Sequence, residues 1–201
     1  MNVSSDLVHA LFTFAPNPYG GVEVDTTARL GKWSGLSPFV LGPVKAFAGA
    51  ESQNFENFWQ FHKVYKCHTD KDGEPTFEWY DWHNKGFMDK RAHRYPMGKG
   101  AIPEYSFWNG EHLGYVGARK KIYAPVYAGF VAKTVAYKLL CSLHESTYDN
   151  KVHLVLRDYD AYDHLKLGMS LKDVINNPDR KMGHAFVLLM MLTGVLEECL
   201  E

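Results

Sequence analysis

The chain has 201 residues, of which 46% are hydrophobic and 22% are charged, and its net charge is −1 at pH 7. This length predicts one globular domain, and the small net charge excludes a polycation, so any nucleic-acid contact needs a local basic patch. The three cysteines lie far apart without metal-ligand spacing, which indicates free thiols in a reducing compartment. Neither a basic leader nor an apolar run long enough to span a bilayer occurs, so we expect a cytoplasmic protein without a membrane segment.

The first 50 residues predict short strands and an apolar loop. Residues 7–14 form an apolar run that suits a strand or a short helix, and the alternation at 22–28 favours a strand. Two glycines and two prolines at 33–43 exclude a long regular element. This loop is either a packed connection or a segment whose backbone meets a ligand. A short strand is expected at 44–47.

Residues 52–66 contain no glycine or proline, and their aromatic residues recur at helical spacing, which predicts an amphipathic helix. Glu56, Gln60 and Lys63 stand at i, i+4 and i+7 and therefore share one face. Next to Trp59, these groups suit the wall of a polar pocket, and they equally suit an exposed face that carries an ion pair. Burial among aromatic rings would raise the pKa of Glu56 unless Lys63 offsets it.

The segment 77–108 combines aromatic and basic residues, among them Lys85, Lys90, Arg91 and Arg94. Basic groups neutralise phosphates and aromatic rings stack on bases, so the segment suits an extended single-stranded or flipped-out nucleic acid. A solvated surface loop would have the same composition.

The second half of the chain is mainly helical. Asn109-Gly110 predicts a tight turn, residues 126–143 predict a core helix of about five turns, and residues 183–200 predict a strongly apolar final helix. Together with the short strands, this pattern predicts an α+β fold that is mainly α.

Residues 152–156 suit a short strand or the tail of a helical hairpin, and the acidic run that follows them contains Asp158 and Asp160. Ser170 and Asp173 then have the layout of a capping box, which predicts a short helix. The usual nucleotide-binding, zinc-hydrolase and serine-nucleophile motifs are absent from the sequence, so we expect no metal and no cofactor.

The remaining candidate is a reaction carried out by carboxyl groups. Two carboxyl groups around a sugar can cleave a glycosidic bond, because one stabilises the oxocarbenium-like centre or activates water while the other manages the proton. Glu56 and the acidic run could supply this pair. Lys63 and Arg119 are candidate phosphate contacts.

Five short motifs follow one another along the sequence. They are Leu-Ser-Pro-Phe at 36–39, Glu-Asn-Phe-Trp-Gln-Phe-His-Lys at 56–63, Tyr-Val-Gly-Ala-Arg at 115–119, Asp-Tyr-Asp at 158–160 and Gly-His-Ala at 183–185. In this order the chain resembles the NADAR superfamily of YbiA-like proteins, which is linked to NAD and ADP-ribose metabolism. The family pattern has Leu-Ser-Asn-Phe, Glu-His-x-x-Gln-x-x-Lys, Trp-x-x-x-Arg, Asp-x-x-Trp-Gly and Gly-Arg-Asn. Here the Trp-Gly of the acidic turn is missing, and Gly-Arg-Asn has become Gly-His-Ala.

The resemblance implies a single NADAR-like α+β domain over residues 1–201, with the segment 77–108 as an insert. It implies an ADP-ribosyl glycohydrolase that cleaves the N-glycosidic bond between ADP-ribose and guanine in single-stranded DNA. Such an enzyme reverses DarT-type DNA ADP-ribosylation as an antitoxin, or as phage counter-defence in the host cytoplasm. The alternatives are an N-glycosidase of a small phosphoribosyl metabolite, such as a riboflavin-pathway intermediate, and a non-catalytic binder of ADP-ribose or modified nucleic acid. The oligomeric state stays open.

The resemblance also implies roles for individual residues. The expected catalytic residues are Glu56 and Asp160. The expected ligand-binding residues are Ser37, Phe39, Trp59, Gln60, Lys63, Tyr115, Arg119, Asp158 and His184. The expected nucleic-acid contacts are Lys85, Lys90, Arg91 and Arg94.

Overall fold

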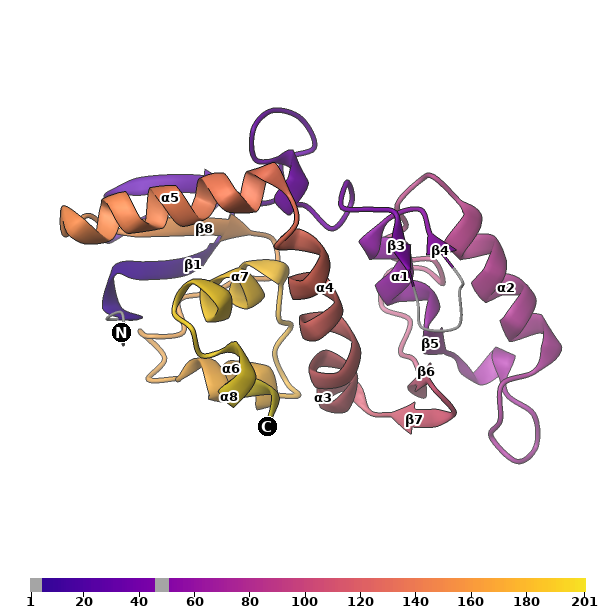
Figure 1. The fold of residues 1–201 in the computed structure, drawn as a ribbon. Helices are drawn as coiled ribbons and strands as arrows, with labels where there is room; N and C mark the ends of the chain where they lie inside the picture. Colours follow the sequence, from indigo (N-terminus) through magenta and orange to yellow (C-terminus); the bar gives the residue numbers. More distant parts are fainter. Residues whose placement is uncertain (1–4, 46–50) are drawn as a thin grey trace.

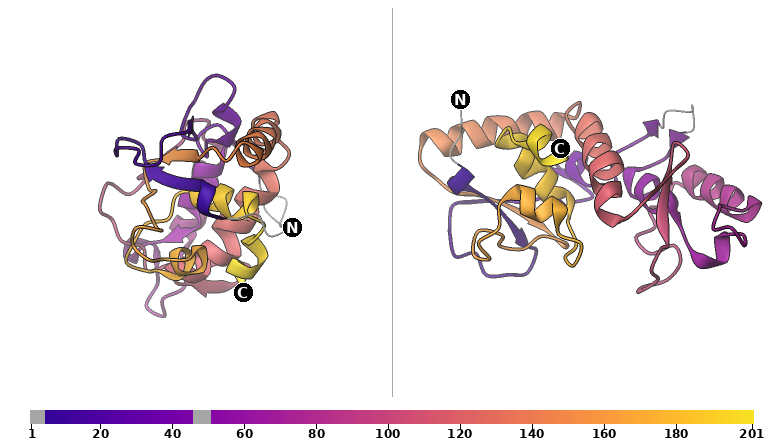
Figure 2. Two further views of the ribbon diagram at one scale, coloured as in Figure 1. Left: turned by 90° about the vertical axis from the view of Figure 1, so that its left-hand side faces the viewer. Right: turned by 90° about the horizontal axis from the view of Figure 1, so that it is seen from below.

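The structure, a computed structural model, describes residues 5–45 and 51–201. Helices account for 41% and strands for 15% of it, which confirms a mixed α+β protein that is mainly helical. Its elements form two groups, which are joined by a helical segment (Figures 1 and 2).

The first group is built on a parallel sheet of three strands, β1 (Val8–Phe12), β8 (Leu154–Asp158) and β2 (Val22–Asp25), in the order β1-β8-β2. The central strand is buried along its whole length, which suits its apolar sequence. Helix α5 (Val135–Asp149) runs along one side of the sheet, and α7 (His184–Leu192) packs on the other (Figure 1). The strand predicted at 22–28 is found at Val22–Asp25 only. Of the alternatives for 152–156 and 7–14, both segments contain strands, at Leu154–Asp158 and Val8–Phe12.

The second group contains α1 (Phe55–Phe61) and α2 (Phe77–Met88), and it lies beyond the joining segment (Figure 1). Its strands are β3 (Val44–Lys45) paired with β4 (Glu51–Ser52), and an antiparallel sheet of β5 (Lys63–Val64), β6 (Tyr105–Trp108) and β7 (Glu111–Leu113). The turn predicted between β6 and β7 is confirmed, with φ of 51° at Asn109 and 80° at Gly110. Residues 46 and 47 of the strand predicted at 44–47 lie outside the described residues.

The joining segment consists of α3 (Tyr115–Ala118), a π-helical turn (Arg119–Tyr123) and α4 (Ala124–Val131). The continuous helix predicted over 126–143 is wrong, because the chain bends by 86° between α4 and α5. Thr134 adopts an extended conformation there and caps α5 by accepting a hydrogen bond from the backbone N–H of Tyr137. In the described part of the chain, no single helix has the length and hydropathy to cross a membrane, whereas the bent pair 115–131 and 135–149 has both when taken together.

Two other predicted elements differ in extent, and one helix was not predicted. The helix predicted over 52–66 ends at Phe61, because Lys63 and Val64 pair with β6 instead. The final helix is interrupted at Gly194, whose φ of 74° is left-handed, and α8 (Leu196–Leu200) follows. The segment 77–88, for which no helix was predicted, forms α2. The capping box of α6 (Leu171–Asn176) is confirmed.

One apolar cluster passes through both groups of elements. Phe55 of α1 contacts the rings of Tyr123 and Tyr127 in the joining segment, with centroid distances of 5.3 Å in both cases. Leu156 of β8 and Ile122 belong to the same cluster. The shared core holds the two groups against each other and fixes the space between them.

Candidate functional site

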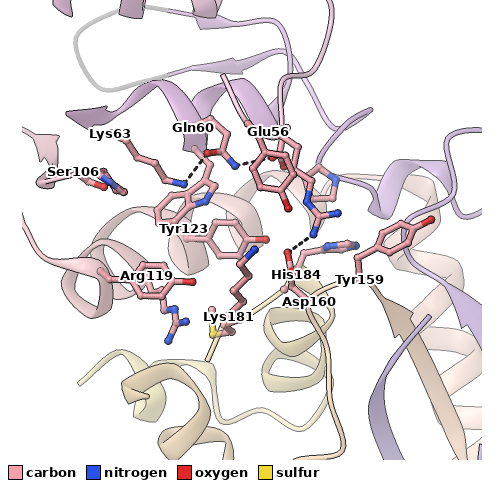
Figure 3. Close-up of a pocket in the computed structure, with 18 of the residues that line it drawn as sticks. Glu56, Gln60, Lys63, Ser106, Arg119, Tyr123, Tyr159, Asp160, Lys181 and His184 are labelled. Carbon is pink, nitrogen blue, oxygen red and sulfur yellow. Dashed lines mark hydrogen bonds and ion pairs between the residues drawn. The ribbon is translucent and has the colours of Figure 1, made fainter. Parts of the chain in front are cut away.

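A pocket of about 840 Å³ lies between the two groups of elements. Every residue that the sequence predicted as catalytic or ligand-binding lines it. These residues come from α1, the loop before it, the joining segment, the end of β8 and the start of α7 (Figure 3). Segments far apart in the sequence therefore build one site.

Glu56, Gln60 and Lys63 form a hydrogen-bonded chain along one wall of the pocket (Figure 3). The Gln60 Nε2 donates to Glu56 Oε1 over 2.9 Å, and the Lys63 Nζ donates to Gln60 Oε1 over 2.7 Å. Glu56 and Gln60 are only 7% and 8% exposed, so the exposed-face alternative is excluded. None of the described residues hydrogen-bonds to Glu56 Oε2, which leaves this oxygen available to a ligand.

Burial shifts the pKa values of the two ionisable groups, Glu56 and Lys63, at the ends of this row of hydrogen bonds. Desolvation raises the pKa of Glu56, although the hydrogen bond from Gln60 and the positive charge of Lys63 oppose the rise. Desolvation also lowers the pKa of Lys63 to about 8, against the attraction of Glu56. The pKa of the Glu56 carboxyl group is therefore shifted towards neutral pH, where the group can exchange protons.

Asp158 and His184 form a buried pair in the opposite wall. The His184 Nδ1 lies 3.1 Å from Asp158 Oδ2, and its Nε2 lies 2.9 Å from the carbonyl oxygen of Thr26. Both acceptors need a donor, so the imidazole is doubly protonated and positively charged. Accordingly the Asp158 carboxylate raises the pKa of His184 despite the opposing effect of burial.

The Asp158 carboxylate is fully engaged by its surroundings. Burial alone would raise its pKa, but His184 and the backbone N–H groups of Ala185 and Asp160 outweigh this effect and lower the pKa to about 2. The approach to α7 is so close that a Cβ on Gly183 would lie 2.0 Å from Asp158 Oδ2. We conclude that Asp158 positions His184 and the start of α7.

Asp160 lies at the mouth of the pocket and pairs with Arg94, whose Nη2 is 2.8 Å from Asp160 Oδ2. Arg94 was predicted as a nucleic-acid contact, but it lines the pocket. Lys85, Lys90 and Arg91 do not, and Lys85 instead forms an exposed ion pair with a neighbouring acid on α2. The basic segment therefore does not act as one surface.

Arg119 has a structural role that the sequence did not reveal. Its guanidinium donates to the backbone carbonyls of Val174, Ile175, Asn177 and Arg180, at and beyond the end of α6. The Tyr115 ring covers it, with 4.0 Å between the guanidinium carbon and the ring centroid. Its Nη1 and Nη2 thus tie the π-helical turn to α6, while its buried Nε has no hydrogen-bond partner in the described structure. The expected phosphate contact stays a prediction.

Lys181 and Tyr123 are among the lining residues that the sequence analysis missed. The Lys181 side chain extends toward Tyr123 in the pocket (Figure 3), and within residues 5–45 and 51–201 its amine has no hydrogen bond or ion pair. Burial raises the pKa of Tyr123 well above 10, and its ring packs 4.9 Å from that of Trp59. Tyr123 stands four residues after Arg119, one helical turn along, which is the signal that could have revealed it.

Among the residues that the structure describes, no group of three or more histidine, cysteine, aspartate or glutamate side chains could hold a metal ion. Ser37 is buried, and its hydroxyl has no hydrogen-bond partner in the described structure. Comparisons of the chain with protein-family models, with curated proteins and with solved structures give no match. The functional proposal therefore depends on the geometry of this pocket and on the motif order.

Proposed function

We propose that the protein is an ADP-ribosyl glycohydrolase that cleaves the N-glycosidic bond between ADP-ribose and guanine in single-stranded DNA. The observation that carries the proposal is the buried Glu56 carboxylate, whose Oε2 is free of hydrogen bonds in the described structure at the wall of a pocket of about 840 Å³. This volume lies within the range of about 300–1,000 Å³ that small-molecule sites have. The motif order that resembles the NADAR superfamily supports the same activity, which would reverse DarT-type modification.

Glu56 would act on the ribose carbon that carries the base. As the carbon–nitrogen bond breaks, positive charge develops on the ribose, and a carboxylate beside it lowers the energy of that state. Water then forms the new carbon–oxygen bond and gives a proton to Glu56. The guanine nitrogen keeps the bonding electron pair and takes up a proton from solvent, and Glu56 returns its proton to solvent, so the products are ADP-ribose and unmodified guanine.

The charges around the pocket suit the diphosphate of this ligand. Lys63 and Lys181 present amines to the cavity, whereas the charge of His184 is balanced by the Asp158 carboxylate 3.1 Å away. Tyr95 and Tyr159 line the mouth, where they could cover a base. Lys181 is thus a further proposed phosphate contact.

A second candidate is an N-glycosidase of a small phosphoribosyl metabolite. One observation favours it: of the four predicted nucleic-acid contacts, Arg94 alone lines the pocket. Without a basic track leading away from the site, a free nucleotide would be bound as well as a DNA strand.

The test is incubation of the purified protein with a single-stranded oligonucleotide that carries ADP-ribosylated guanine. Parallel samples contain ADP-ribosylated guanosine and a small phosphoribosylamine. Mass spectrometry should show free ADP-ribose and the unmodified oligonucleotide. An intact oligonucleotide beside a hydrolysed phosphoribosylamine would replace the proposal by the second candidate. Binding without release of product from any substrate would refute catalysis altogether.

A further inference from the structure

Exposed aromatic rings lead from the pocket mouth onto the turn after β1. The Arg94 guanidinium lies 5.4 Å from the Tyr95 ring and 5.5 Å from the Tyr159 ring. The Phe14 ring meets Tyr159 edge-on with a centroid distance of 6.0 Å, and Phe12 meets Phe14 at 5.7 Å. We call Phe12, Phe14, Tyr159 and Tyr95 the ring row.

The rings of this row are open to solvent. Phe14 is 75% exposed, and the other three members are between 40% and 44% exposed. Tyr95 and Tyr159 line the pocket, so the row begins at the site itself. Core packing therefore does not account for the position of Phe14.

The turn that carries Phe14 is held firmly. Arg157 Nη1 donates to the carbonyl oxygens of Phe12 and Ala15 over 3.1 and 2.8 Å. Arg157 is itself buried and pairs with Glu23 through two hydrogen bonds of 3.0 and 2.7 Å. A ring presented on such a backbone loses little conformational freedom when it binds a partner.

Positive charge accompanies the rings. Arg94 lies between two of them, and the Lys181 amine lies 5.5 Å from the Tyr95 ring. The neighbouring acid Asp160 is paired with Arg94. A row of rings with cations at one end matches the bases and phosphates of a strand. A protein partner would need a broad patch rather than a single file of ring contacts.

We propose that the ring row binds the nucleotides that flank the modified base in single-stranded DNA, with one base stacked on Phe14 and another near Tyr159. This inference rests on the proposed action on DNA and locates the rest of the strand. It assigns the strand to the turn after β1 and to Arg94 and Tyr95, and not to the rest of the segment 77–108.

The test measures binding of a fluorescein-labelled, unmodified oligothymidylate by fluorescence anisotropy. Phe14→Ala should weaken binding at least about fivefold, whereas Phe14→Tyr keeps a ring and should bind like the wild type. Phe77→Ala is the matched control, because Phe77 is 81% exposed on α2 and lies outside the row. With modified substrates, Phe14→Ala should lower kcat/KM for the oligonucleotide and leave that for ADP-ribosylated guanosine unchanged.

Unchanged oligothymidylate binding by Phe14→Ala would overturn the inference, as would an equal loss in Phe77→Ala. A change in oligomeric state in Phe14→Ala, measured by light scattering with binding intact, would identify the row as a contact between copies of the chain and also overturn it. If Phe14 proves necessary for binding but no ADP-ribose is released, the proposed function fails and the ring row stands. If ADP-ribose is released and Phe14 has no effect on binding, the proposed function stands and the inference about the ring row fails.

Discussion

The Asp158 carboxylate lies 3.1 Å from the His184 imidazole, and both side chains are buried at the wall of the pocket. The second ring nitrogen of His184 is committed to the carbonyl of Thr26, so the pair is an ion pair and not a neutral contact. One wall of the pocket thus carries a buried ion pair, while the other carries a carboxyl group with a raised pKa.

Replacing Asp158 by asparagine should leave a buried imidazolium without its counter-ion. We expect Asp158→Asn to lower the free energy of unfolding by about 3–5 kcal/mol, measured by urea denaturation at pH 7. Asp179→Asn is the control, since Asp179 is exposed and should change stability by less than about 0.5 kcal/mol. A loss below about 1 kcal/mol for Asp158→Asn would contradict the ion pair.

The stability difference between the wild type and Asp158→Asn should depend on pH. The pKa of Asp158 is lowered from 3.8 to about 2, so its contribution is complete above pH 4 and disappears as the pH falls from 4 towards 2. The pKa of His184 is raised, so its contribution is complete below pH 6.5 and declines as the pH rises through the raised value. Urea denaturation of both proteins across this range should therefore show the largest difference between about pH 4 and 6.5, because other buried histidines cancel in the comparison.

Gly183→Ala tests how closely Asp158 approaches α7. The new Cβ would lie 2.0 Å from Asp158 Oδ2, so the carboxylate must move and the free energy of unfolding should fall by at least about 1–3 kcal/mol. Gly129→Ala provides the comparison, because a Cβ in that exposed position of α4 meets nothing within 4 Å. It should raise stability by about 0.5–1 kcal/mol. Equal thermal unfolding temperatures for the two variants would show that Asp158 has room to relax.

The pH profile of the reaction should report Glu56. The proposal needs its carboxylate form, and its pKa is raised above 4.5, so kcat/KM should fall on acidification at a higher pH than for an ordinary glutamate. Glu56→Gln should lower kcat by about 10²–10⁴-fold at every pH without changing the thermal unfolding temperature by more than a few degrees. Lys63 loses its charge above about pH 8, so KM should rise there if it binds phosphate. An acidic limb that survives in Glu56→Gln would assign the titration to another group.

Arg119→Lys distinguishes a structural arginine from a ligand contact. A lysine cannot donate to four carbonyls in the same fork, so stability should fall by about 1.5–3 kcal/mol, while KM for the folded protein stays unchanged. Lys121→Ala removes an exposed ion pair with Glu111 and should cost less than about 1 kcal/mol. A large rise in KM with unchanged stability would support the phosphate role of Arg119.

The sequence predicts the pocket wall that contains Glu56 because the residues of that wall lie close together in the sequence. Glu56 and Gln60 stand one helical turn apart, and their hydrogen bond requires only a helix. Lys63 reaches the same wall by a different route, since it leaves the helix and enters β5. The spacing therefore identified the right side chains through a helix that is shorter than expected.

Residues that depend on distant partners could not be found in this way. Arg94 turns inward because Asp160 lies across the pocket mouth, and Arg119 is held by carbonyls beyond α6. Neither partner is visible in the local pattern. Helix α2 was missed because few of its residues are buried and its apolar face is narrow. The break at Gly194 could have been predicted, since glycine in an apolar helix marks a possible end.

The parallel sheet also has a consequence for synthesis of the protein. Val8 of β1 pairs with Leu154 of β8, so the first strand can pair only after the ribosome has synthesised a residue far along the chain. At about 5–20 residues per second, this delay is roughly 7–30 s. During that time the segment of α1 with Glu56 has been synthesised, but the wall made by Asp158 and His184 does not yet exist. A translation product that stops before β8 would therefore contain Glu56 without the opposite wall of the pocket.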